Sequence, residues 1–113
     1  MQDHAWIKEL PVSITVSDAD GTLIAMNDCS HKAYSSQGES LIGANMLGCH
    51  SQASREKLAA MMQNHATNIY TIEKNGVKKM VVHTPWYVDG VYSGHVEFVF
   101  TLPETIPHCL RQS

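Results

Sequence analysis

The sequence predicts an α+β domain in which a β-hairpin and a later three-stranded meander are separated by helices. Three observations support this fold class. Residues 12–16 alternate between apolar and polar side chains, which is the period of a half-buried strand. Apolar residues recur at helical spacing within 51–64. Asn75-Gly76 and Asp89-Gly90 each separate two strand-like runs, and such pairs are typical of two-residue hairpin turns of type I′.

The N-terminal third is expected to hold a short helix followed by the hairpin. The helix would cover residues 2–10 and end before Pro11, because a residue that precedes proline avoids helical angles. The hairpin would join strands 12–16 and 22–26 through a turn at Asp18–Gly21, where glycine can adopt a positive φ.

The middle of the chain is expected to be helical. Asn27-Asp28 offers N-cap side chains for a short helix that reaches about residue 36. Glycines punctuate residues 38–50, which predicts short helical turns there. Ser51 can cap a longer helix that reaches about Asn64, and strands at 67–74, 77–88 and 91–102 complete the chain.

Length, composition and charge are those of a single folded domain. The chain has 113 residues, of which 43% are hydrophobic and 17% charged, and a net charge of -3. The absence of a basic patch argues against nucleic-acid binding, and the longest apolar runs are too short to cross a bilayer. No signal peptide is expected, and three widely spaced cysteines favour a reducing, cytoplasmic location.

Two-residue turns would determine which side chains of the meander face the helices. Counting outward from both turns predicts an inward, mainly apolar face; its members would be Tyr70, Ile72, Val81, His83, Val96, Phe98 and Phe100. The outward face would be mixed, with His95 and Glu97 solvated or at an interface, or paired as metal ligands as the less favoured alternative. Pro85 opposite Gly94 indicates a β-bulge, beyond which the two faces would exchange.

The order of elements and several short motifs resemble the PAS family over roughly residues 10–108. The motifs are the strand before Asp18–Gly21, Asn27 after the second strand, and the run from Leu41-Ile42-Gly43 to Cys49-His50. The last of these is similar to an "IGxNLxxCH" stretch found in a subgroup of bacterial sensory PAS domains.

The resemblance implies a PAS-like five-stranded antiparallel sheet with short helices packed on one face. It implies an N-terminal helical extension at 1–10, a sensor domain at 11–103 and a C-terminal tail at 104–113. A small-molecule ligand would lie between the inner sheet face and the main helix. A homodimer through the outer sheet face and the N-terminal helix, and an effector domain or partner protein, are also expected.

Eight residues are candidates for ligand or cofactor binding: His83, Cys49, His50, Tyr70, Val81, Val96, Phe98 and Met61. His83 could bind a ligand or haem iron, or it could be a core histidine bonded to a backbone carbonyl or to Tyr70. Cys49 and His50 precede the main helix, where a helix dipole lowers the pKa of a thiol. They could bind haem, act as a thiol redox switch or donate hydrogen bonds to a ligand carboxylate. Alternatively, Cys49 could be a small core residue and His50 a helix-entry cap.

The function that the sequence favours is signalling through ligand or partner binding, without catalysis. P-loop, dinucleotide-binding and zinc-protease motifs are absent. The sequence does not identify a cofactor; haem ligated by His83 or His50 is one alternative, and a thiol switch at Cys49 is another.

Overall fold

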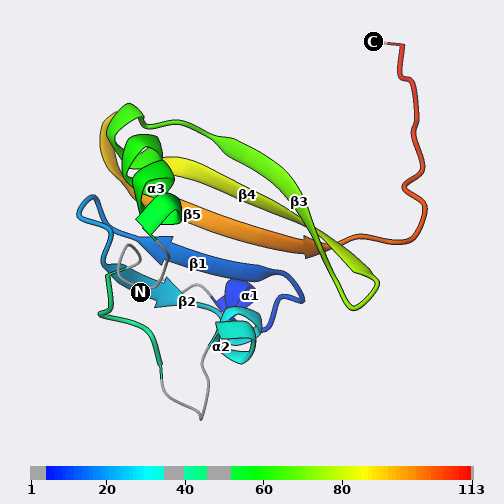
Figure 1. Cartoon of the computed structure of the whole chain (residues 1–113), viewed down its shortest axis with the longest axis horizontal. Helices are drawn as coiled ribbons and strands as arrows, with labels where there is room; N and C mark the ends of the chain where they lie inside the picture. The colour runs from blue at the N-terminus through cyan, green and yellow to red at the C-terminus, as the bar shows by residue number, and fades with distance from the viewer. Residues whose placement is uncertain (1–4, 35–39, 46–51, 113) are drawn as a thin grey trace.

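A five-stranded antiparallel sheet forms the framework of the computed structural model, which describes residues 5–34, 40–45 and 52–112 (Figure 1). The strands lie in the order β2-β1-β5-β4-β3, so the N-terminal hairpin joins the meander through β1 and β5. Their bounds are β1 Ser13–Ser17, β2 Leu23–Met26, β3 Asn68–Lys74, β4 Val77–Val88 and β5 Val91–Thr101. The α+β fold class and the five-stranded sheet are therefore confirmed.

The described helices lie on both sides of this sheet. They are α1 Ala5–Lys8, α2 Asp28–Tyr34 and α3 Gln52–Asn64. α2 and α3 cover the same face, which we call the inner face; α2 contacts it through a hydrogen bond between Ser30 and Thr15 of β1. α1 lies against the opposite, outer face, where Ile7 lines a groove together with Ile14. No helix in the described ranges is both long and apolar enough to cross a membrane.

Side-chain hydrogen bonds hold the N-terminal hairpin in place. The Asp18 carboxylate accepts bonds from the backbone N–H groups of Asp20 and Thr22, at 2.9 and 3.0 Å. Gly21 takes a φ of +88°, as expected for this turn. Leu23, two residues after Gly21, is buried, so the strand that follows the turn enters the core.

The predicted register of β3 against β4 is confirmed. Asn75 and Gly76 have φ values of 54° and 78°, so both residues have the positive φ that a type I′ turn requires. Tyr70 therefore pairs with Val81 and Asn68 pairs with His83, as counting from the turn predicts. Because paired residues point to the same face, these four side chains share the inner face.

The predicted register of β4 against β5 is correct at the turn and wrong beyond it. Val88 pairs with Val91, but the register shifts by one residue between Trp86 and Tyr87. His83 consequently pairs with Glu97 instead of Val96. The bulge indicated by the sequence is present, and it exchanges the two faces of β5.

The bulge arises at Gly94, which has a φ of +142°. A Cβ atom at this position would lie 1.9 Å from the Ser17 carbonyl oxygen, so only glycine fits. Trp86 donates a hydrogen bond from Nε1 to the same Ser17 oxygen at 2.9 Å. The extra residue of β5 is therefore accommodated by a close backbone approach to β1.

Candidate ligand-binding cavity

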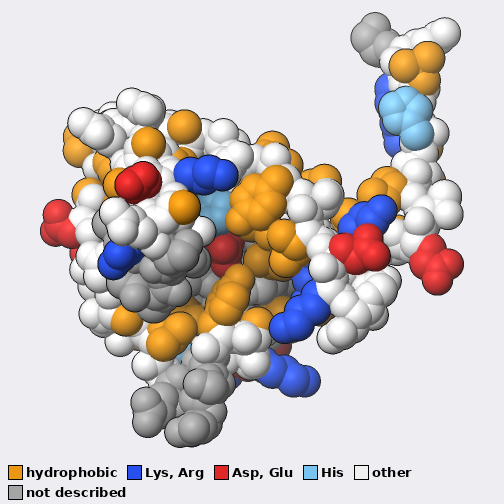
Figure 2. Space-filling view, viewed as in Figure 1, with side chains coloured by type: hydrophobic (Ala, Val, Ile, Leu, Met, Phe, Trp, Pro, Cys, Tyr) orange, Lys and Arg blue, Asp and Glu red, His pale blue; other side chains and the backbone are white. Residues whose placement is uncertain are grey.

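A cavity of about 430 Å³ lies between α3 and the inner face of the sheet. Its lining residues are Ser54, Lys57, Leu58, Met61, Asn68, Tyr70, His83 and Glu97. The space-filling view shows histidine and acidic surface within a hollow that is bordered by apolar side chains (Figure 2). The volume falls within the usual range for small-molecule sites.

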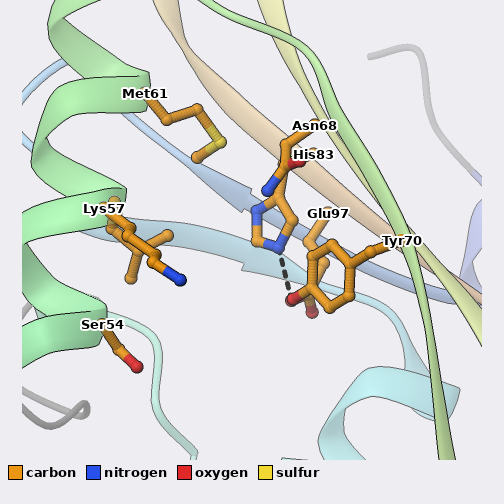
Figure 3. Close-up of a pocket in the computed structure, with 8 residues that line it drawn as sticks. Ser54, Lys57, Met61, Asn68, Tyr70, His83 and Glu97 are labelled. Carbon is orange, nitrogen blue, oxygen red and sulfur yellow. Dashed lines mark ion pairs between the residues drawn. The ribbon is translucent and has the colours of Figure 1, made fainter.

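The lining residues come together because of the helical repeat of α3 and the pairing of residues across the strands. Ser54, Lys57, Leu58 and Met61 lie three or four residues apart, so they share one face of α3. Across the sheet, Asn68, His83 and Glu97 form a single row on neighbouring strands, and Glu97 continues that row to Thr15 of β1. One helix face and one row of the sheet thus meet across the cavity (Figure 3).

Glu97 and His83 form the polar floor of the cavity. His83 Nε2 lies 3.4 Å from Glu97 Oε2, and His83 is only 6% exposed. The other carboxylate oxygen, Oε1, accepts a 2.9 Å hydrogen bond from the Tyr34 hydroxyl at the end of α2. Burial raises the pKa of the Glu97 carboxyl, and the Tyr34 hydrogen bond opposes that rise.

Two tyrosines beside this carboxylate remain neutral hydrogen-bond donors. Burial and the adjacent Glu97 carboxylate raise the pKa of the Tyr34 hydroxyl above that of a free phenol. The same two causes raise the pKa of Tyr70. The Tyr70 ring also stacks on His83, with ring centroids 6.1 Å apart and planes 12° from parallel.

The opposite wall carries a positive charge. Lys57 points from α3 towards the cavity, on the side opposite the His83–Glu97 pair (Figure 3). Among the described residues Lys57 forms no ion pair with Glu97. The cavity therefore has a cationic side chain on its helical wall and an anionic one on its sheet wall.

The structure brings together some of the predicted site residues and separates others. His83, Tyr70 and Met61 line the cavity. Val81 lies two residues before His83 on β4 and is buried on the same face, but it does not line the cavity. Whether any of these residues binds a ligand remains a prediction.

Val96 and Phe98 are the two candidates whose predicted placement is wrong. The bulge at Gly94 turns both to the outer face, where Val96 lines the groove beneath α1. Phe98 pairs with Ile14 on that face and stacks on Phe100, with centroids 6.1 Å apart. Cys49 and His50 lie outside the described residues.

Glu97 is the most important residue that sequence reasoning placed wrongly, since it was expected on the outer face. The signal that could have found it was the bulge itself, because a one-residue shift moves Glu97 inward beside His83. Asn68 could also have been found, because its pairing with His83 was counted correctly. The lining residues of α3 other than Met61 carried no distinctive sequence signal.

His95 was also expected on a solvated or interface face, and the same bulge buries it. It is 2% exposed, with Nδ1 2.7 Å from the Tyr92 hydroxyl and Nε2 3.0 Å from the Ala66 carbonyl oxygen. His95 therefore links β5 to the segment that follows α3. The described residues contain no cluster of three or more histidine, cysteine or acidic side chains that could hold a metal ion.

A second hollow, of about 480 Å³, lies on the outer face beside α1. Its lining is mostly apolar: Ile7, Lys8, Ile14, Val16, Ile24, Ala25, Met26, Asn27, Trp86 and Val96. Trp6 of α1 is 68% exposed. This surface corresponds to the outer face from which the sequence predicts a dimer.

Comparison with solved structures finds the same fold in several bacterial domains, among them a PAS domain and a sensory box sensor histidine kinase. A PAS domain from Colwellia psychrerythraea superposes with a TM-score of 0.65 and 18% identity, covering 87% of this chain and 92% of that chain. A sensory box sensor histidine kinase from Vibrio cholerae gives 0.65 and 12%, covering 89% of each chain. A C-terminal domain from Streptococcus mutans gives 0.69 and 18%, covering 86% of this chain and 80% of that chain.

These likenesses establish a PAS-like fold at low sequence identity. No family model matches the sequence, and no curated protein matches it either. The resemblance to the subgroup with the "IGxNLxxCH" stretch therefore remains a prediction.

Proposed function

We propose that this chain is a sensory domain that binds a small polar molecule in the cavity between α3 and the inner sheet face. The observation that carries the proposal is the His83–Glu97 pair, held at the floor of a 430 Å³ cavity that faces Lys57. Polar groups converging in a concave site of this size supply both orientation and specificity to a ligand. The PAS-like fold of sensory proteins supports the same function by analogy.

Ligand binding can be tested with variants of α3 that do or do not fill the cavity. Leu58→Trp adds an indole to a lining position, whereas Ala59→Trp adds the same group to an exposed, non-lining position of the same helix. Metabolites that raise the melting temperature of the native chain should also stabilise Ala59→Trp but not Leu58→Trp. The proposal would be overturned if a metabolite stabilised both variants equally. It would also be overturned if no compound in a broad panel of polar metabolites stabilised the native chain.

The lining does not fit haem. The faces of the macrocycle are largely hydrocarbon and are best buried against apolar walls, whereas Leu58 and Met61 are the only aliphatic lining residues in the described part of the site. Haemin titration is expected to give no Soret band that depends on His83, and a band lost in His83→Ala would contradict this argument.

A homodimer formed through the outer face and α1 is the second part of the proposal. The apolar groove beside α1 and the exposed Trp6 support it, because burial of such surface favours association. Light scattering during gel filtration should show a dimer that Trp6→Ser weakens. If the native chain stays monomeric at high concentration, the proposed homodimer is refuted. The proposed ligand site on the inner face would not be affected by that result.

A further inference from the structure

We propose that the ligand of this cavity is a small zwitterion, with a carboxylate directed at Lys57 and a cationic amine directed at Glu97, as in an amino acid. This inference rests on the proposed ligand-binding function and names the chemical class that the site would accept. The two walls of the cavity carry opposite charges, and these charges differ in how deeply they are buried.

The anionic end of the site is Glu97. Its side chain is 21% exposed, and both oxygens face donors that carry no obligatory charge, the Tyr34 hydroxyl and the His83 ring. A buried carboxylate is stabilised most by a full positive charge that also donates hydrogen bonds. Within the described part of the cavity, Lys57 lies on the opposite wall, on α3. The ammonium group of a ligand would therefore supply the positive charge beside Glu97.

The cationic end of the site is Lys57, with Ser54 about one helical turn before it on α3, and Asn68 lies on the facing sheet beside His83. An ammonium, a hydroxyl and an amide N–H₂ can all donate to a carboxylate. Lys57 is exposed, so water screens its charge and its contribution to affinity is smaller than that of Glu97. Leu58, Met61 and the Tyr70 ring leave an apolar surface between the two ends for a short side chain.

Other simple charge patterns fit this cavity less well. A dicarboxylate would place one anion against Glu97, and a diamine would place one cation against Lys57; like charges in such positions are repelled. A hydrocarbon would remove water from Glu97, His83 and Asn68 without replacing its hydrogen bonds. A single molecule with one charge of each sign satisfies both walls.

The test is a calorimetric comparison of amino acids with their charge-blocked derivatives on the intact chain. Each amino acid that binds would be measured beside its N-acetyl form, which lacks the cation, and its carboxamide, which lacks the anion. N-acetylation is expected to weaken binding at least about 10-fold, because it removes a charge-assisted bond to a group that is only partly exposed. Amidation should weaken binding only about 3-fold, because Lys57 is exposed.

Two variants test whether Glu97 causes the loss of affinity on N-acetylation and Lys57 the loss on amidation. Glu97→Gln can still accept the Tyr34 hydrogen bond, so it should fold while losing most of the discrimination against the N-acetyl form. Lys57→Met retains the aliphatic stem and should lose the discrimination against the carboxamide. Thermal unfolding of each variant checks that the fold is intact, and the two discriminations should change independently.

The outcomes separate this inference from the proposed function. Tight binding of dicarboxylates, diamines or uncharged molecules, blocked by Leu58→Trp, would overturn the zwitterion assignment and leave the sensory function in place. Amino acids that bind with the same discrimination in Glu97→Gln would also overturn it. A failure of every class of compound to bind would overturn the proposed function itself.

Discussion

Replacing Asn27 with alanine is expected to lower the free energy of unfolding by about 3 kcal/mol. Asn27 directly follows β2 and is only 4% exposed. Its Oδ1 accepts bonds from the backbone N–H groups of Ile14 and Ser30, both at 3.0 Å. Its Nδ2 donates to the carbonyl oxygens of Ile7 and Val12, at 3.1 and 2.8 Å. One amide thus connects β1, α2 and the segment that carries α1.

The magnitude follows from these four bonds and from the burial of their partners. A net contribution of about 1 kcal/mol for each bond would give about 4 kcal/mol. Water can reach Ile7 and Val12, which are only half-buried, so part of that loss is recovered. Ile14 and Ser30 are buried, and their N–H groups would stay unsatisfied. Because small domains are stable by only about 5–15 kcal/mol, a loss of about 3 is readily measured.

Urea unfolding followed by far-UV circular dichroism would measure this loss. Asn64→Ala is the matched control, because Asn64 is exposed at the end of α3 and should change stability by less than about 0.5 kcal/mol. Asn27→Asp keeps the two acceptor bonds but loses both donor bonds, and should therefore also destabilise the fold. A loss below about 1 kcal/mol in Asn27→Ala would refute the reasoning that these bonds hold the N-terminal region to the sheet.

Three further predictions follow from the site and the bulge. Burial raises the pKa of Glu97 above the ordinary value of 4.5. Between these two pKa values the folded state keeps a proton that the unfolded chain loses. Ionisation of Glu97 therefore destabilises the fold as pH rises from 4.5 through the pKa of the folded state. Urea unfolding at several pH values should therefore show Glu97→Gln gaining stability over the native chain as pH increases from 4.5, and a pH-independent difference would contradict this. Tyr34→Phe removes a hydrogen bond that lowers the pKa of Glu97, so NMR titration of the carboxyl carbon should find that pKa higher in the variant, and an unchanged or lower pKa would show that the bond is not formed in solution. Gly94→Ala places a Cβ atom against the Ser17 carbonyl and should cost more than about 3 kcal/mol, whereas Gly90→Ala meets open space and should cost only about 1 kcal/mol of backbone strain; similar losses would show that β5 is not held against β1 there.

Local sequence signals predicted most elements of the fold. The two I′ turns predicted β3, β4 and the start of β5, and both turns have the positive φ values that such turns require. The main helix was expected at 51–64 and is found as Gln52–Asn64. The helix expected at 2–10 is found at Ala5–Lys8; residues 2–4 lie outside the described ranges, and at its C-terminal end the helix stops before Glu9.

A smaller part of the candidate site could be predicted for the same local reason. Tyr70 and His83 are connected by a two-residue turn, and counting from that turn placed both on the inner face. Glu97 could not be placed by counting, because the length of chain between Asp89-Gly90 and Glu97 contains the bulge. Tyr34 and Lys57 come from helices whose positions over the sheet depend on packing across the whole domain.

The sequence by itself determined the secondary structure and the turns, because these depend on backbone angles and side-chain periods within a few residues. Tertiary structure decided which side chains of β5 face the helices. Gly94 lies close against the Ser17 carbonyl of β1, a strand more than seventy residues away in sequence. That contact turns Glu97 towards His83 and sends Val96 and Phe98 to the outer face. The charged floor of the cavity therefore results from a long-range steric constraint on a single glycine.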